Sequence, residues 1–313
     1  MTNNPAVVAS AYGEPDVLTL IAAERPTPGP GQVLIEVRAG GINPLDYKLY
    51  SGMMGNDPAA LPMRLGLEVS GVVAEIGPEQ PESDALAVGD AVLADRVKGG
   101  YAAYVVADRG DVFAKPETLS FEAASGLLVV GATAVDLLTT TDVTAGDTVL
   151  VHGASGGVGS LVVQLAVARG ARVIGTAGAH RHDEVRQLGA EPIAYGEGLA
   201  DRVRALAPDG IDVALDTVGT EEAIDTSAEL VTDRGRIATI ANFVQAPALG
   251  IQVLTGAGPS AEVRARSRQL LVDLASEGAL LVKVDRTFPL SQAAQAHTYL
   301  KTGKAQGKLA LIP

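Results

Sequence analysis

The feature that most constrains this chain is a glycine-rich segment that lies between an apolar run and a helical run. Residues 148–151 are short and apolar, residues 154–159 read Ala-Ser-Gly-Gly-Val-Gly, and residues 160–169 have a helical pattern. Glycines there allow a tight turn, and the helix start then offers free N–H groups to an anion. The glycine pattern alone also fits a purely structural turn. With a second strand at 171–175, it is typical of a βαβ unit that binds a dinucleotide pyrophosphate.

The alternation of strand and helix continues beyond this unit. A helix capped by Ser120 precedes it, and further strands are expected at 192–194, 213–215 and 236–240, with helices near 183–188, 199–206 and 221–230. Such alternation predicts a parallel sheet with helices on both faces. Residues 122–258 are therefore predicted to form an α/β, doubly wound dinucleotide-binding domain.

The first part of the chain has a different character. Short strand-like runs at 33–37, 69–74 and 91–94 are separated by proline and glycine turns, a pattern that predicts a β-rich, barrel-like domain. The C-terminal part holds helices near 261–274 and 291–300 and strands at 281–284 and 308–312. We expect residues 1–121 to form the catalytic domain and residues 259–313 to complete it.

The amino-acid composition limits the classes of binding partner and of catalytic chemistry that are possible. The net charge of −13 disfavours binding to nucleic acids and to anionic membranes. No cysteine is present, which excludes disulfides, thiol catalysis and cysteine-ligated metals. The N-terminal residues do not resemble a signal peptide, and no apolar run reaches the roughly 18 residues of a membrane span. A cytoplasmic protein with a small-molecule substrate is expected.

The residues after the second strand favour NADPH over NADH. An NAD site usually carries an acid about 20 residues beyond the turn, yet residues 175–179 contain none and the first is Asp183. Arg181 precedes it, and a guanidinium can bind a 2′-phosphate through two hydrogen bonds. The alternative for Arg181 is a solvated residue at a helix start. His180 and His182 are interpreted as surface residues.

Five motifs in order carry a family resemblance. They are residues 28–35, residues 41–48 with the sequence Gly-Ile-Asn-Pro-Leu-Asp-Tyr-Lys, residues 66–73, the glycine turn at 151–159, and the segments 288–297 and 307–308. Together they resemble the zinc-free quinone oxidoreductase branch of the medium-chain dehydrogenase/reductase superfamily, which includes zeta-crystallin. The resemblance covers nearly the whole chain. It implies a GroES-like catalytic domain beside the dinucleotide-binding domain, and a homodimer.

The resemblance also bears on metal binding. In zinc-dependent relatives a cysteine occupies the position of Asn43 and a histidine that of Leu67, and neither residue here can replace that set. The four-cysteine lobe is missing between Gly77 and Gly89. A catalytic zinc needs three protein ligands, and His152 and His297 are interpreted as packing or capping residues. No metal is expected.

The resemblance implies roles for individual residues. Asn43 is expected to hydrogen-bond the ribose or the substrate oxygen, with an Asn-Pro turn as the alternative. Candidate proton donors are Tyr47, Lys48 and Tyr50, and solvent is a further alternative. Thr133 is expected at the nicotinamide amide, or bonded to its own helix backbone. The full set of predicted cofactor-binding residues is Thr133, Ala154, Ser155, Gly156, Gly157, Val158, Gly159, Thr176, Gly178, Arg181, Tyr195, Val218, Ala241, Asn242, Phe243 and Lys308.

The function that follows is reduction of a quinone or an α,β-unsaturated carbonyl by NADPH without zinc. Two alternatives stay open: an enoyl reductase that tailors a polyketide or acyl intermediate, and a low-turnover NADPH-binding sensor or structural protein. A zinc alcohol dehydrogenase is contradicted by the residues at the ligand positions.

Overall fold

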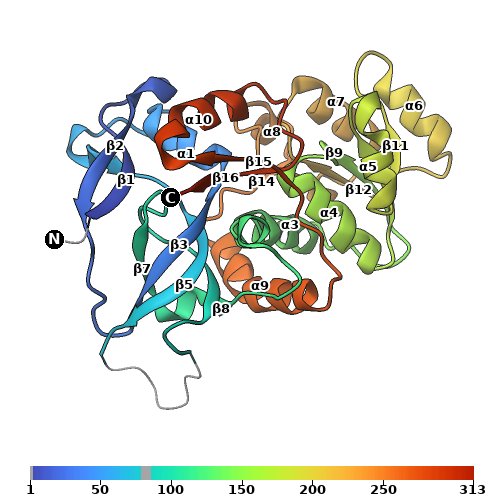
Figure 1. Cartoon of the computed structure of the whole chain (residues 1–313). Helices are drawn as coiled ribbons and strands as arrows, with labels where there is room; N and C mark the ends of the chain where they lie inside the picture. Colours follow the sequence, from blue (N-terminus) through green and yellow to red (C-terminus); the bar gives the residue numbers. More distant parts are fainter. Residues whose placement is uncertain (1–2, 79–85) are drawn as a thin grey trace. The chain divides into compact units, whose positions relative to one another are not determined.

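The chain folds into two units that are interleaved along the sequence. The computed structural model describes residues 3–78 and 86–313. One unit comprises Met1–Val129 with Leu271–Pro313, and the other comprises Val130–Leu270 (Figure 1). Part of the segment between Gly77 and Gly89, where the four-cysteine lobe is missing from the sequence, lies outside the described residues.

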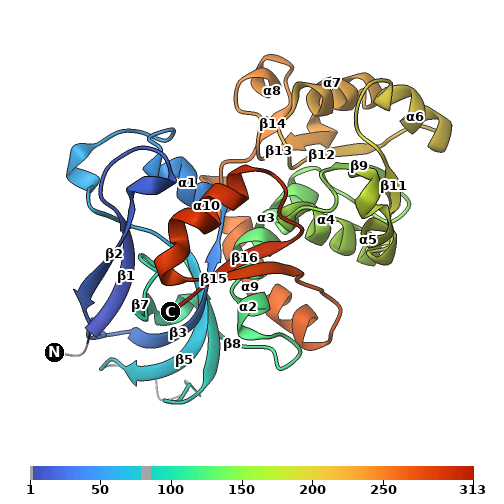
Figure 2. The same ribbon diagram turned by 45° about the horizontal axis from the view of Figure 1, so that its top comes forward.

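The second unit is built on a six-stranded parallel sheet. Its order is β11-β10-β9-β12-β13-β14, and every neighbouring pair is parallel. Figure 2 shows β12, β13 and β14 following one another toward one edge. The doubly wound sheet predicted from the sequence is confirmed. Its strands are β9 (Thr148–His152), β10 (Arg172–Thr176), β11 (Glu191–Ile193), β12 (Val213–Asp216), β13 (Ile237–Thr239) and β14 (Gln252–Val253).

Helices cover both faces of this sheet. Helix α4 packs against β9 and β10, whereas α6 and α7 pack against each other beyond the opposite face (Figure 1). Leu150, Ile174, Val203 and Ile224 belong to the buried cluster between the sheet and that helix pair. The helices are α3 (Leu128–Thr140), α4 (Gly157–Ala168), α5 (His182–Gln187), α6 (Leu199–Leu206), α7 (Glu221–Leu230), α8 (Gln245–Ala248) and α9 (Pro259–Ser276).

The first unit is β-rich, as predicted. A seven-stranded sheet has the order β15-β16-β3-β5-β6-β8, with β7 also paired to β3, and a three-stranded sheet has the order β2-β1-β4. The strands are β1 (Asn3–Ala9), β2 (Leu18–Glu24), β3 (Gln32–Ile42), β4 (Met63–Arg64), β5 (Glu68–Ile76), β6 (Ala91–Asp95), β7 (Tyr104–Asp108), β8 (Val112–Ala114), β15 (Val284–Pro289) and β16 (Lys308–Ile312), and the helices are α1 (Pro44–Tyr50), α2 (Phe121–Ala124) and α10 (Ala293–Lys301).

The last strand closes the first unit. Strand β16 is antiparallel to β3 and parallel to β15, so the C-terminal residues lie inside the sheet begun by residues 32–42. The strand expected at 281–284 lies later in the chain. Leu281 is 63% exposed, whereas Phe288 is buried among the residues of α10 and β16. Burial of Phe288, rather than the apolar run that precedes it, sets this register.

Both boundaries between the units fall later than the sequence suggested. The helix that Ser120 begins ends after one turn at Ala124, and α3 starts separately at Leu128. A Cβ on Gly126 would lie 2.8 Å from Cγ of Lys308, so this break lets the chain pass close to β16. At the second boundary, Ala275 near the end of α9 accepts a hydrogen bond from Thr118 Oγ1 at 2.6 Å, which ties that end to the first unit.

Short 3-10 segments complete the fold. They are η1 (Pro15–Val17), η2 (Pro58–Ala60), η3 (Arg109–Asp111), η4 (Ala179–Arg181), η5 (Arg234–Arg236) and η6 (Leu290–Gln292). None of the described helices combines the length and the apolar character that crossing a membrane requires.

Candidate functional site

The glycine turn of the second unit has the geometry of an anion cradle. Strand β9 ends at His152, and Gly156 is the extended N-cap residue of the 12-residue helix α4. A Cβ on Gly159 would lie 2.1 Å from the carbonyl oxygen of Gly153, and Gly153 itself has φ +78°. Side chains are therefore excluded at both positions. The first N–H groups of α4 have no acceptor within the helix, and together with the helix dipole they suit a pyrophosphate.

Strand β10 holds this turn in place. The hydroxyl of Thr176 accepts a hydrogen bond from the Gly153 N–H at 3.1 Å, and its carbonyl accepts one from the Ala154 N–H at 3.0 Å. Ala154 and Thr176 are both buried. Val218 is about half exposed, and its Cγ1 would lie 2.6 Å from a Cβ on Gly153. These three predicted residues therefore support the turn from beneath and beside it.

Arg181 lies against the turn. Its guanidinium donates to the carbonyl oxygen of Ser155 and to Oε2 of Glu184, at 3.1 Å from Nη2. Only 11% of the Arg181 side chain is exposed. This low exposure does not fit the solvated alternative for Arg181, whereas its contact with a 2′-phosphate stays a prediction.

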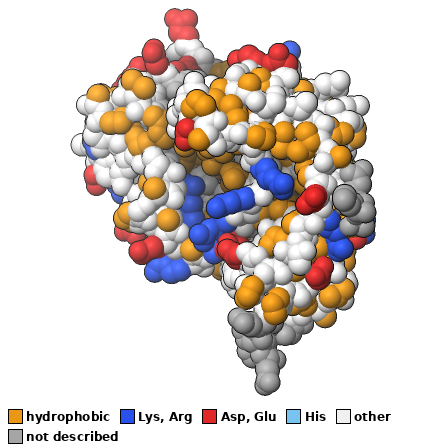
Figure 3. Space-filling view, turned by 90° about the vertical axis from the view of Figure 1, so that its left-hand side faces the viewer, with side chains coloured by type: hydrophobic (Ala, Val, Ile, Leu, Met, Phe, Trp, Pro, Cys, Tyr) orange, Lys and Arg blue, Asp and Glu red, His pale blue; other side chains and the backbone are white. Residues whose placement is uncertain are grey.

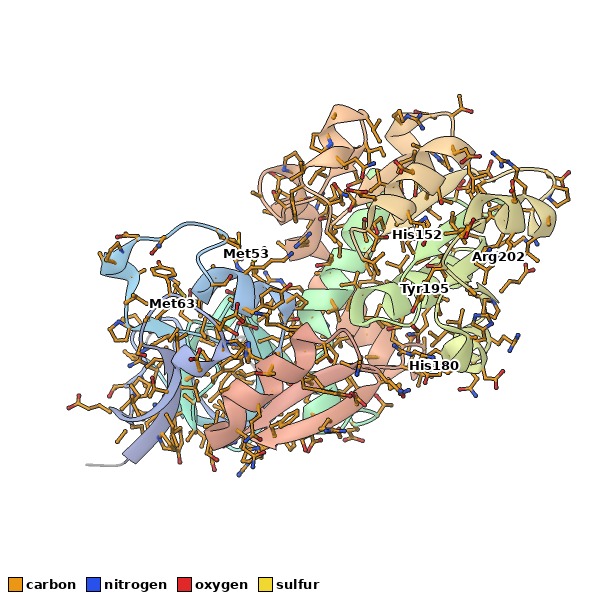
Figure 4. All side chains as sticks on the ribbon, turned by 90° about the horizontal axis from the view of Figure 1, so that it is seen from above. Met53, Met63, His152, His180, Tyr195 and Arg202 are labelled. Carbon is orange, nitrogen blue, oxygen red and sulfur yellow. The ribbon has the colours of Figure 1, made fainter. Side chains whose placement is uncertain are left out.

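Three residues surround the carboxyl end of β10. A Cβ built on Gly178 would lie 2.9 Å from Cε1 of His180 and 3.7 Å from the hydroxyl oxygen of Tyr195. Tyr195 follows β11 and is 62% exposed. Figure 4 shows Tyr195 and His180 on the same part of the second unit. His180, interpreted from the sequence as a surface residue, thus shares a neighbour with the predicted cofactor residue Tyr195.

The residues after β12 and β13 form a second hydrogen-bonded corner. The buried carboxylate of Asp216 accepts from the backbone of Val218 and Gly219 and from Thr239 Oγ1, the last at 2.6 Å. Thr239 Oγ1 in turn accepts from the N–H groups of Ala241 and Asn242. Those two N–H groups are therefore engaged within the protein.

The side chains at this corner differ in accessibility. Asn242 is buried, and its side-chain oxygen accepts from the N–H groups of Gln245 and Ala246 at the start of α8. Phe243 is 47% exposed, and Thr133 on α3 is buried. The side chain of Asn242 thus caps α8. Contact of these residues with a nicotinamide remains a prediction.

In the first unit, Asn43 belongs to a buried ionic network. Nζ of Lys308 donates to Oδ1 of Asn43 at 2.7 Å, to Oε1 of Glu68 at 2.9 Å and to the Ile42 carbonyl at 3.1 Å. The side-chain amide of Asn43 donates to Glu68 at 3.0 Å. Lys308 is 5% exposed. An ammonium has three donors, and all three are used here, so we correct the assignment of Lys308 to the cofactor.

The first unit also contains a buried chain of hydrogen bonds that begins at Asp46. This carboxylate accepts from Tyr101 Oη and from the N–H of Asn43, both at 2.9 Å. His297 lies between Tyr101 Oη, 3.2 Å from its Nε2, and Tyr50 Oη, 3.1 Å from its Nδ1. Burial raises the pKa of Asp46 to about 6 and lowers that of His297 to about 4. His297 is a packing residue, as the sequence suggested.

This chain of hydrogen bonds changes the set of candidate proton donors. Tyr50 is 1% exposed and its hydroxyl faces His297, and burial raises its pKa. We therefore correct the assignment of Tyr50 as a donor. Tyr47 and Lys48 are partly buried on α1, and desolvation lowers the pKa of Lys48, which favours release of its proton.

The described residues offer no metal centre. No group of three or more His, Asp or Glu side chains within 3–78 and 86–313 is arranged to hold an ion. His152 is buried on β9 with Nε2 3.1 Å from Ser227 Oγ, and burial lowers its pKa to about 4. It is a core residue.

A parallel-sheet dinucleotide fold joined to a β-rich unit of this topology defines the medium-chain dehydrogenase class. Residues 29–117 match the alcohol dehydrogenase GroES-like domain, and residues 188–311 match the zinc-binding dehydrogenase family. The chain belongs to the quinone oxidoreductase branch of the medium-chain dehydrogenase/reductase superfamily.

Individual relatives are similar over nearly the whole chain. A quinone oxidoreductase of Mus musculus is 31% identical, over 98% of this chain and 97% of that protein. An NADPH-dependent alkenal/one oxidoreductase of Arabidopsis thaliana is 32% identical, over 98% of this chain and 79% of that protein. A mycobacterial protein solved in complex with NADPH is 30% identical with a TM-score of 0.87, and the match covers 99% of this chain and 100% of that one.

Several residues of the two units were not found from the sequence. Glu68, Asp46 and Tyr101 carry the buried networks of the first unit, and Arg202 and Glu222 bind the loop that carries Tyr195. Glu68 and Asp46 lie inside motifs that the sequence analysis recognised, and the available signal for Glu68 was a charged residue within an otherwise apolar motif. No comparable signal marks Arg202.

Proposed function

We propose that this protein is an NADPH-dependent reductase that transfers a hydride to a quinone or an α,β-unsaturated carbonyl without zinc. The observation that carries the proposal is the Gly153–Gly159 cradle with the Arg181 guanidinium bound beside it. The cradle suits a pyrophosphate, and the guanidinium suits a phosphate close to it. NADPH, when bound, supplies the hydride.

Different residues of the second unit are proposed to bind different parts of the cofactor. The backbone of residues 156–159 would bind the pyrophosphate, and Arg181 and Tyr195 would bind the 2′-phosphate. No acid is present at the end of β10 to repel that phosphate. The mycobacterial protein solved with NADPH and the NADPH-dependent Arabidopsis relative support this choice of cofactor. Thr133 and residues 241–243 are proposed to border the nicotinamide.

The absence of zinc is supported by the environment of Asn43. Its side-chain oxygen already accepts from the Lys308 ammonium, and Lys308 also pairs with Glu68. A dication beside this ammonium would be repelled, and no cysteine is available as a ligand. The residues present do not fit a catalytic zinc.

Reduction of a carbon–carbon double bond also needs a proton. We propose Lys48 as its source, with Tyr47 second, because desolvation lowers the pKa of Lys48 and its ammonium can also stabilise a developing oxyanion. Quinone reduction can take its proton from water. A homodimer and a cytoplasmic location are further parts of this proposal.

The test is oxidation of NADPH and NADH in the presence of 1,4-benzoquinone, 9,10-phenanthrenequinone and a 2-alkenal. We expect turnover with at least one acceptor, a preference for NADPH and no loss of activity after treatment with a chelator. No turnover with any acceptor would overturn the enzymatic proposal, and inhibition by the chelator would overturn its zinc-free part. With a 2-enoyl thioester as a further acceptor, activity confined to that substrate would indicate an enoyl reductase.

Arg181→Met tests the phosphate assignment. We expect the Kd for NADPH to rise roughly tenfold, equivalent to about 1.4 kcal/mol, with little change for NADH. Arg186→Met is the matched control, because Arg186 lies on the adjacent helix α5 and pairs with Asp183 at the surface. Equal weakening of both cofactors by Arg181→Met would contradict the assignment.

A further inference from the structure

The loop between β11 and α6 needs help to keep one conformation. It spans residues 194–198, and its two glycines, Gly196 and Gly198, have φ values of +106° and +76°. Glycine has more backbone freedom to lose than any other residue. Tyr195 lies in this loop and is 62% exposed, so packing of its own side chain does little to hold the loop.

Arg202 supplies the missing restraint from the first turns of α6. Its guanidinium donates to the carbonyl oxygens of Ala194 at 2.9 Å, Gly196 at 3.0 Å and Glu197 at 2.5 Å. Its Nε is buried and has no partner among the described residues. Figure 4 shows Arg202 and Tyr195 on neighbouring parts of the second unit. One side chain thus joins three of the five loop residues.

A second element holds the same loop from the other side. Glu222, in the first turn of α7, accepts a hydrogen bond from the N–H of Gly196 at 3.1 Å. The backbone of Gly196 is therefore fixed at its N–H by α7 and at its carbonyl by α6. The residue next to Gly196 is Tyr195, whose hydroxyl oxygen lies 3.7 Å from a Cβ built on Gly178.

We propose that Arg202 is a positioning residue for the 2′-phosphate end of the cofactor, and that it sets the preference for NADPH by fixing Tyr195 beside Gly178. This inference rests on the proposed function. The 2′-phosphate is expected at the end of the second strand, where Gly178, His180 and Arg181 lie. A loop without a fixed conformation would have to become ordered each time the cofactor binds. The conformational entropy lost in that step would lower the affinity for NADPH selectively.

The chemistry of the clamp requires arginine. A guanidinium is planar and presents five N–H donors in a fixed fork, so it can reach three carbonyls that diverge. A lysine ammonium is a compact charge and would satisfy fewer of them. Arg202→Lys keeps the positive charge. It is therefore expected to retain only part of the NADPH affinity that Arg202→Met loses.

The experiment compares Arg202→Met and Arg202→Lys with Arg204→Met. Arg204 lies on the same helix but makes exposed ion pairs with Asp201 and Glu229, so it controls for loss of charge and of helix contacts. We expect Arg202→Met to raise the Kd for NADPH roughly tenfold and that for NADH less than about twofold. The kcat at saturating NADPH is expected to stay near the wild-type value.

A readout without cofactor tests the clamp directly. Hydrogen exchange of the amides of residues 195–198 should become faster in Arg202→Met and in Glu222→Ala, and should stay unchanged in Arg204→Met and Glu221→Ala. Glu221 is the exposed neighbour of Glu222 on α7. If Arg202→Met does not fold, Glu222→Ala still reaches the same loop from α7.

The outcomes separate this inference from the proposed function. A wild-type protein that does not prefer NADPH would count against the proposed function, whatever the exchange data show. A wild-type preference that Arg202→Met and Glu222→Ala leave intact would overturn the inference alone. In a Tyr195→Phe background, Arg202→Met should add little further loss of NADPH affinity, because both changes remove one interaction. Full additivity would also overturn it.

Discussion

At Gly159 the space for a side chain is occupied by the backbone of the preceding turn. A Cβ would lie 2.1 Å from the carbonyl oxygen of Gly153, so even alanine must displace either the turn or the start of α4. We expect Gly159→Ala to reduce the free energy of unfolding by about 2 kcal/mol or more and to weaken NADPH binding at least tenfold. Urea unfolding and cofactor titration measure the two effects.

The control for this substitution is Gly110→Ala. A Cβ at Gly110 meets no atom within 4 Å, and its φ lies outside the left-handed region. Its unfolding midpoint and NADPH affinity should stay close to those of the wild type. If Gly159→Ala behaved like Gly110→Ala, the close approach at the turn would not constrain the site.

At Lys308 the structure makes a different prediction from the sequence. Lys308→Met leaves the Glu68 carboxylate buried without its cation, and breaking a buried pair in this way costs about 3–5 kcal/mol. We expect a large fall in the free energy of unfolding and less than a threefold change in the Kd for NADPH, because the ammonium contacts only protein atoms. Adding Glu68→Gln should restore part of the stability. If Lys308→Met were stable but bound NADPH much more weakly, Lys308 would again be assigned to the cofactor site.

At the scale of elements, α9 is tied to α3 by one buried carboxylate. Asp136 on α3 accepts from Ser260 Oγ at 2.7 Å and from Arg264 Nε at 2.8 Å. Asp136 is fully buried, whereas Arg264 is 25% exposed. The ion pair therefore lies at the border between α3, α9 and solvent.

Asp136→Asn should weaken this connection. The amide keeps one acceptor but places an NH2 group against the donors, so we expect a loss of about 2 kcal/mol, measured by urea unfolding. Asp225→Ala serves as the control because Asp225 is exposed on α7 and accepts from the side chain of Gln245. If both variants unfolded at the same urea concentration as the wild type, the hydrogen bonds of Asp136 would not contribute to stability.

The elements differ in how well the sequence predicted them. The bounds of α6 and α7 are those expected at 199–206 and 221–230, because glycine and threonine at their starts act locally. Strand β15 was misplaced because its position depends on pairing with β16 and on burial of Phe288. Local signals set helix ends, whereas long-range pairing sets this strand.

At the scale of the whole molecule, charge is unevenly distributed. The net charge is −13, yet Figure 3 shows Lys and Arg side chains gathered near the middle of one face, with Asp and Glu side chains around its margins. The net charge still disfavours polyanionic partners such as nucleic acids. A local group of cations is compatible with attraction of a small anion.

Three buried groups with shifted pKa values contribute to the response of the protein's stability to acid. The pKa of His152 and of His297 is about 4, below the 6.5 of an unfolded histidine, so their stabilising contribution is complete above pH 6.5 and is lost as the pH falls toward 4. Asp46 acts in the opposite direction because burial raises its pKa to about 6. The sum is a loss of about 3 kcal/mol from pH 7 to pH 4.5.

Urea unfolding at the two pH values checks this sum. His152→Gln should be less stable at pH 7 but should lose about 2–3 kcal/mol less on acidification. His180→Gln, at an exposed position, should show the wild-type dependence. An unchanged slope in His152→Gln would mean that its burial does not govern the acid response.

The sequence by itself determined the features that depend on neighbouring residues. The glycine turn and the alternation of strands and helices follow from backbone sterics and from spacing along one βαβ unit. The lack of cysteine limited the chemistry in the same direct way.

Only the tertiary structure decided which polar groups meet. Lys308 reaches Asn43 and Glu68 because β16 pairs with β3 across more than 200 residues, and Glu222 on α7 reaches the N–H of Gly196 in the Tyr195 loop, 26 residues earlier in the chain. A hydrogen bond forms only when its donor–acceptor distance is correct to within a few tenths of an ångström. No local sequence pattern fixes such a distance between segments far apart in the chain. The glycine cradle was therefore readable from the sequence, whereas the clamp that holds Tyr195 was not.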